Sequence, residues 1–460
     1  MMINLPKKSV VIFAIQNTFY WWKYFAETLS NEFDSIVITE HKTDLIHSMK
    51  DRYYHFMNDR SVKTKFSDDE LDEIWKRCRV LRSLKYEQAR KMIIGFENAY
   101  EEFFSSRKVD YILSFPIDRY PMDVLERVAK RHGAEYLEVT VCLFKNTSML
   151  LKRGIPLILP EGISKSITYQ DAYNTLISSS YKPVYITKAK KFTKLKWFQK
   201  YIWQNSRSLA FKAIMLLEND FKGLHYLDSQ MYLKHKVSFF DINFEKLVNW
   251  DYKKILLSAP REKNIILALQ LYPEASIDYW VKDLSIVDYE SYVLKFIEIM
   301  SNKGYNIFLK DHPLQFGFRQ LDFIKKAKLN KNVYFLPYES DINQLVDYCG
   351  ISMTTTGTVG LQASLKGLIS IVTPSYYTNE KDFIVINKEE EISDLPTKIN
   401  SFNRDFDIEE RRKRIIHHLC SITLNGDILS FKQRKGLDKN ESLNDLIEGV
   451  RFYLHNIEKS

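Results

Sequence analysis

The chain of 460 residues is too long for one hydrophobic core and fits two or three domains of ordinary size. Its hydrophobic content of 45% and aromatic content of 14% exclude an intrinsically disordered protein. A net charge of +9 favours anionic partners such as nucleotide phosphates, lipids or glycans, without choosing among them. The four cysteines are far apart and form no CxxC pair, which excludes a zinc ribbon and gives no support for a disulfide scaffold. We expect four buried, reduced thiols.

The N-terminus predicts a buried strand and a cytoplasmic protein. No apolar run reaches the roughly 18 residues needed to span a bilayer. The apolar run at residues 9–15 follows two lysines, but it stops at Gln16-Asn17-Thr18 without a small-residue cleavage site, which argues against a signal peptide. The aromatic residues from 19 to 33 have helical spacing, with Asn17 or Thr18 as N-cap, and a second apolar run follows at 35–40. This βαβ pattern predicts a parallel sheet, and the absence of a glycine-rich fingerprint argues against a dinucleotide-dependent oxidoreductase.

Residues 41–107 predict a helical insertion in the first domain. The acids of Ser67-Asp68-Asp69-Glu70 are typical of a first helical turn. Residues 109–160 return to alternating strands and helices, with a strand expected at 155–159 before Pro160-Glu161-Gly162. The N-terminal domain is therefore expected to be α/β and doubly wound, with a carboxylate loop at Glu161.

Residues 163–250 predict basic helices. Between residues 188 and 212 there is no acid, and cations alternate with aromatic residues. The residues concerned are Lys188, Lys190, Lys191, Lys194, Lys196, Lys200, Arg207 and Lys212, with Phe192, Trp197, Phe198, Tyr201, Trp203 and Phe211. Two interpretations stay open: a patch that docks peripherally on anionic lipid at the inner membrane face, or a solvated basic helix whose aromatics pack on the domain core. No nucleic-acid-binding motif accompanies the stretch, so we expect no nucleic-acid partner.

Residues 251–405 predict a second α/β domain, and 406–460 predict trailing helices. The first domain would then cover 1–250. Ligands of such sheets bind at the carboxyl ends of the strands, and the loops at Glu161, Glu274 and His312 all follow apolar strands. We expect the two α/β domains to face each other across a cleft into which these loops converge.

The turn Thr354-Thr355-Thr356-Gly357-Thr358 follows an apolar strand and opens a helix. Backbone N–H groups, hydroxyls and the positive end of a helix dipole meet there, which suits a phosphate. Gly357 and Gly360 would let the backbone approach a ligand closely. We therefore predict that Thr355, Thr356, Gly357 and Thr358 bind the phosphate of a nucleotide.

Four local blocks resemble the capsular polysaccharide synthesis family, which includes the Kdo transferases of capsule assembly. The blocks are Pro160-Glu161-Gly162, LALQLYPEASI at 267–277, KDHP at 310–313 with Gly317-Phe318-Arg319 beyond it, and TTGTVGLQASLKG at 355–367. The resemblance implies two Rossmann-like domains of the GT-B type. It implies transfer of a sugar, favoured here as a CMP-linked 2-keto acid sugar such as Kdo, to a glycan or lipid-linked glycan acceptor in capsule or lipopolysaccharide synthesis. A UDP- or GDP-sugar transferase, a nucleotide-sugar epimerase and a non-catalytic assembly protein stay open.

The resemblance also implies roles for residues near the donor. Lys310 ends a strand beside the nucleotide, and His312 with Pro313 contacts it. Arg319 would clamp a phosphate or a sugar carboxylate. Gln362 stands where many relatives carry a Glu that grips the ribose hydroxyls, so here a neutral amide would bind them.

Two carboxylates are candidates for catalysis. Glu274, within a block shared with Gln270 and Ser276, matches the acid that acts as nucleophile in a retaining mechanism. Glu161 matches an acid before glycine that deprotonates the acceptor hydroxyl and gives inversion. The sequence does not choose between these courses. No DxD-like element stands in a loop, so we expect a metal-independent transfer with no cofactor besides the nucleotide-sugar donor.

Overall fold

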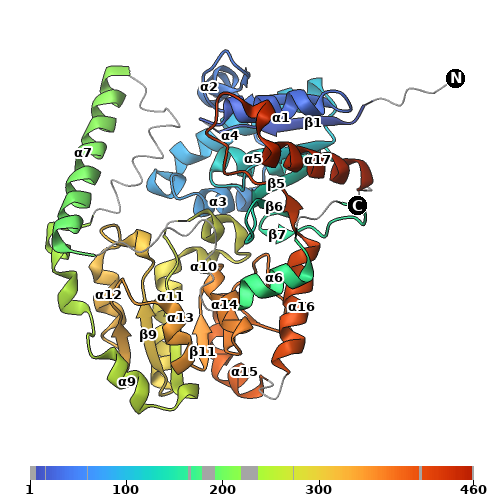
Figure 1. The fold of residues 1–460 in the computed structure, drawn as a ribbon. Helices are drawn as coiled ribbons and strands as arrows, with labels where there is room; N and C mark the ends of the chain where they lie inside the picture. The colour runs from blue at the N-terminus through green and yellow to red at the C-terminus, as the bar shows by residue number, and fades with distance from the viewer. Residues whose placement is uncertain are drawn as a thin grey trace. The chain divides into compact units, whose positions relative to one another are not determined.

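The structure is a computed structural model that describes residues 7–15, 17–59, 61–163, 167–178, 192–218, 237–272, 274–402 and 407–457. The chain divides into two compact units: Met1–Ala172 with His418–Ser460, and Tyr173–His417. Each unit is α/β, with its own sheet and its own hydrophobic core, and Figure 1 labels several elements of each. The predicted pair of Rossmann-like domains is therefore confirmed, while a cleft between them stays a prediction.

The division differs from the boundary at residue 250 that the sequence suggested. The helix α7 (Lys194–Glu218) belongs to the second unit, because Trp197 is buried in the second core together with Phe316. The end of the chain belongs to the first unit, because β14 (Leu424–Asn425) pairs with β6 (Thr147–Lys152) there. Of the basic stretch 188–212, residues 188–191 lie outside the described residues.

The described residues of the first unit form an eight-stranded sheet in the order β14-β6-β5-β4-β1-β2-β3, with β7 on β6. The strands not yet given are β1 (Ser9–Phe13), β2 (Asp34–Thr39), β3 (His47–Ser48), β4 (Tyr111–Ser114), β5 (Glu135–Val141) and β7 (Ile155–Pro156). From β3 to β5 all neighbours are parallel, whereas β6, β7 and β14 are antiparallel to their partners. The sheet is therefore mixed, and the strand expected at 155–159 ends at Pro156 because the chain turns away after a two-residue pairing.

Helices surround this first sheet. They are α1 (Phe19–Leu29), α2 (Lys50–Asn58), α3 (Asp68–Arg77), α4 (Tyr86–Ser106), α5 (Tyr120–Arg131) and α17 (Glu441–Asn456), with α6 (Tyr169–Ile177) at the division between the units. The helix α1 begins after Thr18 and buries Trp21, Trp22 and Phe25 in the first core, which gives the aromatic spacing its physical reason. The helix α3 begins as predicted: Ser67 and Glu70 form a reciprocal capping box.

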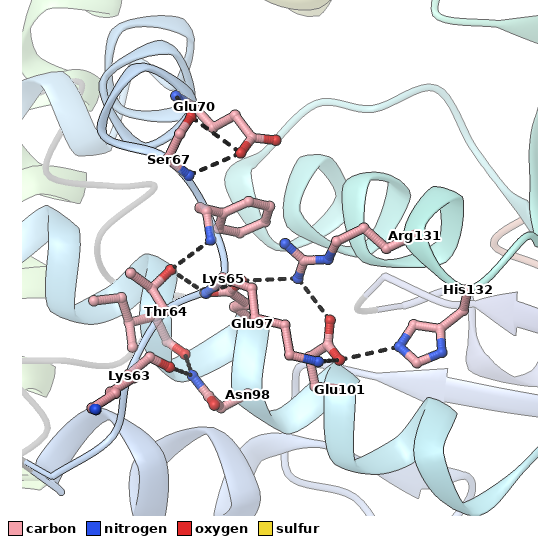
Figure 2. A network of polar contacts seen from close by, with 12 residues as sticks. Lys63, Thr64, Lys65, Ser67, Glu70, Glu97, Asn98, Glu101, Arg131 and His132 are labelled. Carbon is pink, nitrogen blue, oxygen red and sulfur yellow. Dashed lines mark hydrogen bonds and ion pairs between the residues drawn. The ribbon is translucent and has the colours of Figure 1, made fainter.

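The helical insertion is held together by charged side chains, shown in Figure 2. Arg131 at the end of α5 donates to Glu97 at 2.8 Å and to Glu101 at 2.7 Å, both on α4. Glu97 also accepts from the backbone N–H of Lys65 at 3.0 Å, and Glu101 accepts from the Lys65 ammonium. Two buried carboxylates with several donors each tie the segment before α3 to both helices, so the insertion is part of the folded unit.

The second unit has a six-stranded parallel sheet among its described residues, in the order β10-β9-β8-β11-β12-β13. The strands are β8 (Asn264–Ala268), β9 (Asn306–Lys310), β10 (Val333–Phe335), β11 (Ile351–Met353), β12 (Ile369–Val372) and β13 (Ile384–Val385). Its helices besides α7 are α9 (Tyr252–Ser258), α10 (Leu284–Val287), α11 (Tyr289–Asn302), α12 (Leu321–Ala327), α13 (Ile342–Leu345), α14 (Thr358–Leu365), α15 (Leu395–Ser401) and α16 (Ile408–Ser421). All five residues of β8 are buried, as expected for a central parallel strand.

The order of the strands places a topological switch point in each sheet. In the second unit the chain runs from β8 outward to β10, then returns to the other side of β8 with β11. In the first unit it runs from β1 to β3, then returns beside β1 with β4. Open α/β sheets bind their ligands at the carboxyl ends of the strands at such points. The candidate sites are therefore the loops that follow β8 and β11, and those that follow β1 and β4.

The helix α14, which follows β11, is fixed at its C-terminal end by α16. Arg411 donates to the carbonyl of Leu368 at 3.0 Å, and Arg412 donates to that of Leu365 at 2.9 Å. Cations at this end of a helix are stabilised by its dipole. The opposite end of α14 lies at the switch point, so these contacts fix the axis of the helix that starts there.

Two further expectations concern cysteine and membranes. Cys142 and Cys349 are buried free thiols and Cys78 is also buried, whereas Cys420, on α16, is half-buried. No helix among the described residues has the length and apolar character that crossing a bilayer requires.

Candidate functional site

Three loops follow adjacent strands at one edge of the second sheet. They come after β9, β8 and β11, in that order across the sheet. Gln315, in the loop after β9, donates to the carbonyl of Tyr272 at 2.8 Å and accepts from its N–H at 3.1 Å. Tyr272 lies in the loop after β8, so these two loops are bonded to each other.

Gln270 connects the loop after β8 to the turn after β11. Its Nε2 donates to Glu274 Oε2 at 3.0 Å and to Thr356 Oγ1 at 3.1 Å, while its Oε1 accepts from Thr355 Oγ1 at 3.1 Å. Thr356 in turn donates to Ser276 Oγ at 2.8 Å. The predicted residues Gln270, Glu274, Ser276, Thr355 and Thr356 are therefore brought together at the switch point of this sheet.

The start of α14 offers donors to a ligand. Gly357 is the N-cap residue and provides no side-chain cap to the first turn. The side chains of Thr358 and Gln362, half-buried and four residues apart, share one face of α14 and hydrogen-bond to no other described residue. An uncapped helix start with hydroxyl and amide groups beside it suits an anionic oxygen and its neighbouring hydroxyls.

The two glycines of the turn serve contacts within the protein. A Cβ at Gly357 would lie 2.7 Å from Thr354 Oγ1 and 2.9 Å from Gln270 Oε1. A Cβ at Gly360 would lie 2.5 Å from Val372 Cγ1 and 2.9 Å from the Tyr377 hydroxyl. We expected Gly357 and Gly360 to leave room for a ligand. At both positions side chains of the second unit fill that space instead.

His312 lies at the carboxyl end of β9 and is half-buried. Its Nδ1 accepts from the N–H of Leu314 at 3.2 Å, so His312 caps the short turn Pro313–Gln315. Burial lowers the pKa of His312, although the Asp311 carboxylate opposes the shift. The neutral ring therefore carries its proton on Nε2, where it can be donated to a ligand oxygen.

Arg319 lies in a position that differs from the expected clamp. Its side chain is only 1% exposed and donates from Nε to both Asp311 oxygens at 2.9 and 3.0 Å. Its Nη2 donates to the carbonyl of Gln270 at 2.8 Å. Asp311 raises the pKa of Arg319 against the effect of burial. The guanidinium therefore holds the loops after β9 and β8 in place through Nε and Nη2. Its buried Nη1 makes no hydrogen bond to the described residues and lies 3.7 Å from a carboxylate oxygen of Glu290.

Lys310 is similarly engaged with the protein. Its Nζ donates to the carbonyls of Asp311 and Tyr338, both at 2.9 Å. Burial lowers the pKa of Lys310 to about 8, although Asp311 opposes the shift. The Tyr338 hydroxyl donates to Asp311 at 2.9 Å, so Asp311 accepts from the side chains of both Arg319 and Tyr338. Lys310 thus joins the end of β9 to the loop after β10, and this fixes the start of the loop that carries His312.

Sequence reasoning missed the residues that hold the site together. Asp311, Gln315, Tyr289 and Tyr338 were not singled out, although Asp311 stands inside the KDHP block. The hydroxyl of Tyr289 accepts from the N–H of Gln270 at 2.7 Å. Of these four residues, only Asp311 could have been found from the sequence. An acid between Lys310 and His312 needs a cationic partner once it is buried.

Glu161, the second candidate acid, lies in the first unit. It is exposed on a turn where Gly162 has a φ of +89°. This left-handed backbone conformation explains why a glycine stands at position 162, since residues with a side chain adopt it only with strain. The side chain of Glu161 makes no hydrogen bond to the described residues, so it remains available to a substrate.

A second polar group, also missed by the sequence, lies at the switch point of the first sheet. Arg119, after β4, donates from Nη1 to Glu40, after β2, at 2.9 Å, and from Nε to Asp118 at 2.7 Å. Burial works against the charge on Glu40, but Arg119 and His41 outweigh it and hold its pKa below the usual value. The pair joins two loops on either side of the end of β1.

No three His, Cys, Asp or Glu side chains group as metal ligands in the part of the chain that the structure describes. Metal independence stays a prediction.

Comparisons with known proteins give the following findings. No protein-family profile and no curated protein sequence matches the chain. Among solved structures, the KpsC β-Kdo 2,7 transferase of Thermosulfurimonas dismutans is 7% identical, with 96% of this chain and 99% of that chain covered and a TM-score of 0.34. The KpsC β-Kdo 2,4 transferase of the same organism is 11% identical, with 75% and 87% covered and a TM-score of 0.33. The UDP-GlcNAc 2-epimerase of Methanocaldococcus jannaschii, in complex with UDP-GlcNAc and UDP, is 11% identical, with 90% and 99% covered and a TM-score of 0.27.

Kdo transferases, which the sequence motifs resembled, are thus among the structural neighbours, together with nucleotide-sugar epimerases. At these TM-scores the assignment of two Rossmann-like units depends on the two sheets described above.

Proposed function

We propose that this protein is a glycosyltransferase of surface-polysaccharide synthesis that takes its sugar from a nucleotide-sugar donor. The observation that carries the proposal is the cluster at the switch point of the second sheet. There the uncapped start of α14, the hydroxyls of Thr355 and Thr356 and the amide of Gln270 occupy adjacent loops. The N–H groups of this uncapped helix start match a phosphate-bearing leaving group. The side chains of Gln270, Thr355 and Thr356 bond within the cluster and hold the turn that carries these N–H groups.

Each residue then has a role in binding the donor. The N–H groups of the first turn of α14 bind phosphate oxygens, with Thr358 beside them. Gln362, one turn along the same face, binds sugar or ribose hydroxyls. His312 donates from Nε2 to a nucleotide oxygen. Arg319 and Lys310 act as positioning residues, because Asp311 and backbone carbonyls accept from Nε and Nη2 of Arg319 and from Nζ of Lys310.

Glu274 is our preferred catalytic carboxylate. Glu274 accepts a hydrogen bond from Gln270, which also donates to Thr356 in the turn before α14. The position of the Glu274 carboxylate therefore depends on that turn. As a nucleophile it would give a product that retains the configuration of the donor sugar. Glu161, exposed in the first unit, is the alternative: as a base toward the acceptor hydroxyl it would give inversion. The anomeric configuration of the first product, followed by NMR, distinguishes the two.

The donor class that we favour is a CMP-linked 2-keto acid sugar such as Kdo, with UDP- and GDP-sugars next. A thermal-shift assay with CMP, UDP and GDP tests this. A ligand at a hundred times its Kd adds about 2.7 kcal/mol of stability, which raises Tm by several degrees for a unit of this size. We expect CMP to give the largest shift and Thr358→Ala to reduce it.

Four outcomes decide the proposal. Stabilisation by one nucleotide together with acceptor-dependent release of that nucleotide supports it. Conversion of a UDP-sugar without acceptor would make the protein an epimerase. Nucleotide binding without turnover, unchanged by Glu274→Ala and Glu161→Ala, would make it a non-catalytic assembly protein. The absence of any nucleotide effect would contradict nucleotide binding itself.

A further inference from the structure

The helix α7 packs on the second unit with one face only. Trp197 is buried in the second core and stacks on Tyr201 with ring centroids 5.3 Å apart. Lys200 donates to the carbonyl of Phe316 at 2.7 Å, and Gln204 donates to that of Gly317 at 2.8 Å. These residues are three and four positions apart, so they form one face of the helix.

The opposite face carries an exposed apolar stripe. Leu195, Phe198, Ile202 and Leu209 are 66%, 38%, 47% and 67% exposed. Their spacing of three, four and seven residues places them in one line along the helix, about 140° from the packed face. Leucine, isoleucine and phenylalanine in one line are typical of a surface that is covered when the protein functions.

Neighbouring aromatic side chains widen the stripe. Phe198 contacts Phe239 edge-on at 6.4 Å, and Phe239 contacts Phe240 in the same manner. Phe239 and Phe240 begin the 3-10 segment Phe239–Leu247 and are 48% and 78% exposed. We call Leu195, Phe198, Ile202, Leu209, Phe239 and Phe240 together the α7 apolar surface.

The charges around this surface are positive. Among the described side chains of α7 outside the packed face, the cations are Lys194, Lys196 and Arg207, and the sequence has no acid between residues 192 and 217. Arg207 lies over the ring of the exposed Trp203 at 5.3 Å. This cation and indole lie on the flank of the exposed side, because Trp203 is about 100° around the helix from Ile202. Lys194 is paired with Glu245 at 3.2 Å, the acid that offsets part of this charge.

Charge decides between the possible occupants. A second copy of the same helix would bring like charges together, which costs free energy. An anionic bilayer attracts cations with about 1 kcal/mol for each Lys or Arg near its surface and takes up apolar and indole side chains at the headgroup boundary. The α7 apolar surface, with cations and a tryptophan at its side, matches the bilayer.

We propose that the α7 apolar surface docks this protein on the surface of an anionic lipid bilayer. The helix lies parallel to the bilayer over its described length of about 37 Å. The two interpretations left open by the sequence then apply to different faces of one helix. Trp197 and Tyr201 pack on the core, while Phe198, Ile202 and Trp203 face lipid.

Co-sedimentation with vesicles tests the proposal. The full chain is mixed with vesicles of phosphatidylcholine alone, or of phosphatidylcholine with about a third phosphatidylglycerol, at low and at high salt. We expect binding to the anionic vesicles that weakens with salt. The double variant Phe198→Ser/Ile202→Ser should bind at least about tenfold more weakly, because each side chain loses its apolar transfer into lipid. Lys196→Gln should weaken binding about fivefold.

Leu257→Ser/Leu329→Ser is the matched control, since both leucines are exposed on the same unit but lie outside the α7 apolar surface. It should bind like the unmodified chain. Failure to bind anionic vesicles overturns the proposal, as does a loss that is equal in control and test variants. A dimer of the unmodified chain that Phe198→Ser/Ile202→Ser dissociates in gel filtration would assign the surface to a second copy.

Discussion

The side-chain amide of Gln270 lies between Glu274 and Thr356 and donates to both, at 3.0 and 3.1 Å. Its oxygen meanwhile accepts from Thr355. The candidate nucleophile and the candidate phosphate turn are therefore oriented by one residue, although they lie in loops after different strands. A substitution in the turn at residues 354–358 should therefore shift the Glu274 side chain, because this amide contacts both.

The first prediction concerns Gln270 itself. Gln270→Ala removes hydrogen bonds to both loops and should weaken binding of the stabilising nucleotide about tenfold, or by 1–2 kcal/mol. Gln270→Glu should weaken it further, because it brings a second carboxylate beside Glu274. Isothermal titration calorimetry measures both, with Gln199→Ala on the exposed side of α7 as control. An affinity for Gln270→Ala within twofold of the unmodified chain would show that the amide does not order the donor site.

The second prediction separates a positioning role of Arg319 from a ligand-binding role. Asp311→Asn leaves the buried guanidinium of Arg319 with only its longer contact to Glu290, at 3.7 Å, and should lower the free energy of unfolding by about 3–5 kcal/mol. Urea unfolding of the apo protein measures this. Asp322→Asn, which breaks the exposed pair with Lys325, should leave the unfolding midpoint unchanged. A stable Asp311→Asn variant that only loses nucleotide affinity would return Arg319 to the role of a clamp.

The sequence predicted elements whose signal is local. The largely apolar runs at β1 and β8 predicted strands, and Ser67 with Glu70 predicted the start of α3. The grouping of Gln270 with the threonine turn was predicted in outline, since both follow strands that turn out to be neighbours. A donor site there stays a prediction.

Contacts between distant segments could not be predicted in this way. Arg319 pairs with an acid eight positions earlier, and whether its donors face a ligand or the protein depends on how the loop folds. The antiparallel edge of the first sheet depends on β14, which comes from the far end of the chain. The placement of α7 in the second unit follows from Trp197, whose sequence context also fits a free helix.

The third prediction is a pH dependence from Glu138 on β5. This carboxyl is fully buried and, among the described residues, accepts only from the N–H groups of Ile117 and Gly154, at 3.2 and 3.3 Å. Burial raises the pKa of Glu138 from 4.5 to about 7, although the two N–H groups oppose the shift. The folded state therefore binds more protons than the unfolded state between these pH values. Stability from this group is complete below pH 4.5 and is lost as the pH rises through 7, by about 3 kcal/mol.

Urea unfolding of the unmodified chain and of Glu138→Gln between pH 5 and about 8 measures this contribution. Other groups titrate alike in both proteins, so the difference between the two free energies isolates Glu138. We expect that difference to move in favour of Glu138→Gln as the pH rises. Parallel curves would contradict a raised pKa of Glu138 in the folded protein.

The last prediction tests the close approach at Gly357. Its φ of −72° and ψ of 145° suit any residue, so the need for glycine is steric. In Gly357→Ala the new methyl group would meet Gln270 Oε1 and Thr354 Oγ1 at less than 3 Å, and overpacking of this kind costs about 1–3 kcal/mol. The displaced amide should also release Glu274 and lower nucleotide affinity. Gln270→Ala removes one of the two clashing atoms, so the double variant should be more stable than the sum of the single effects predicts. Urea unfolding of the four proteins of this cycle measures the coupling, and additive effects would show that Gln270 and Gly357 do not meet.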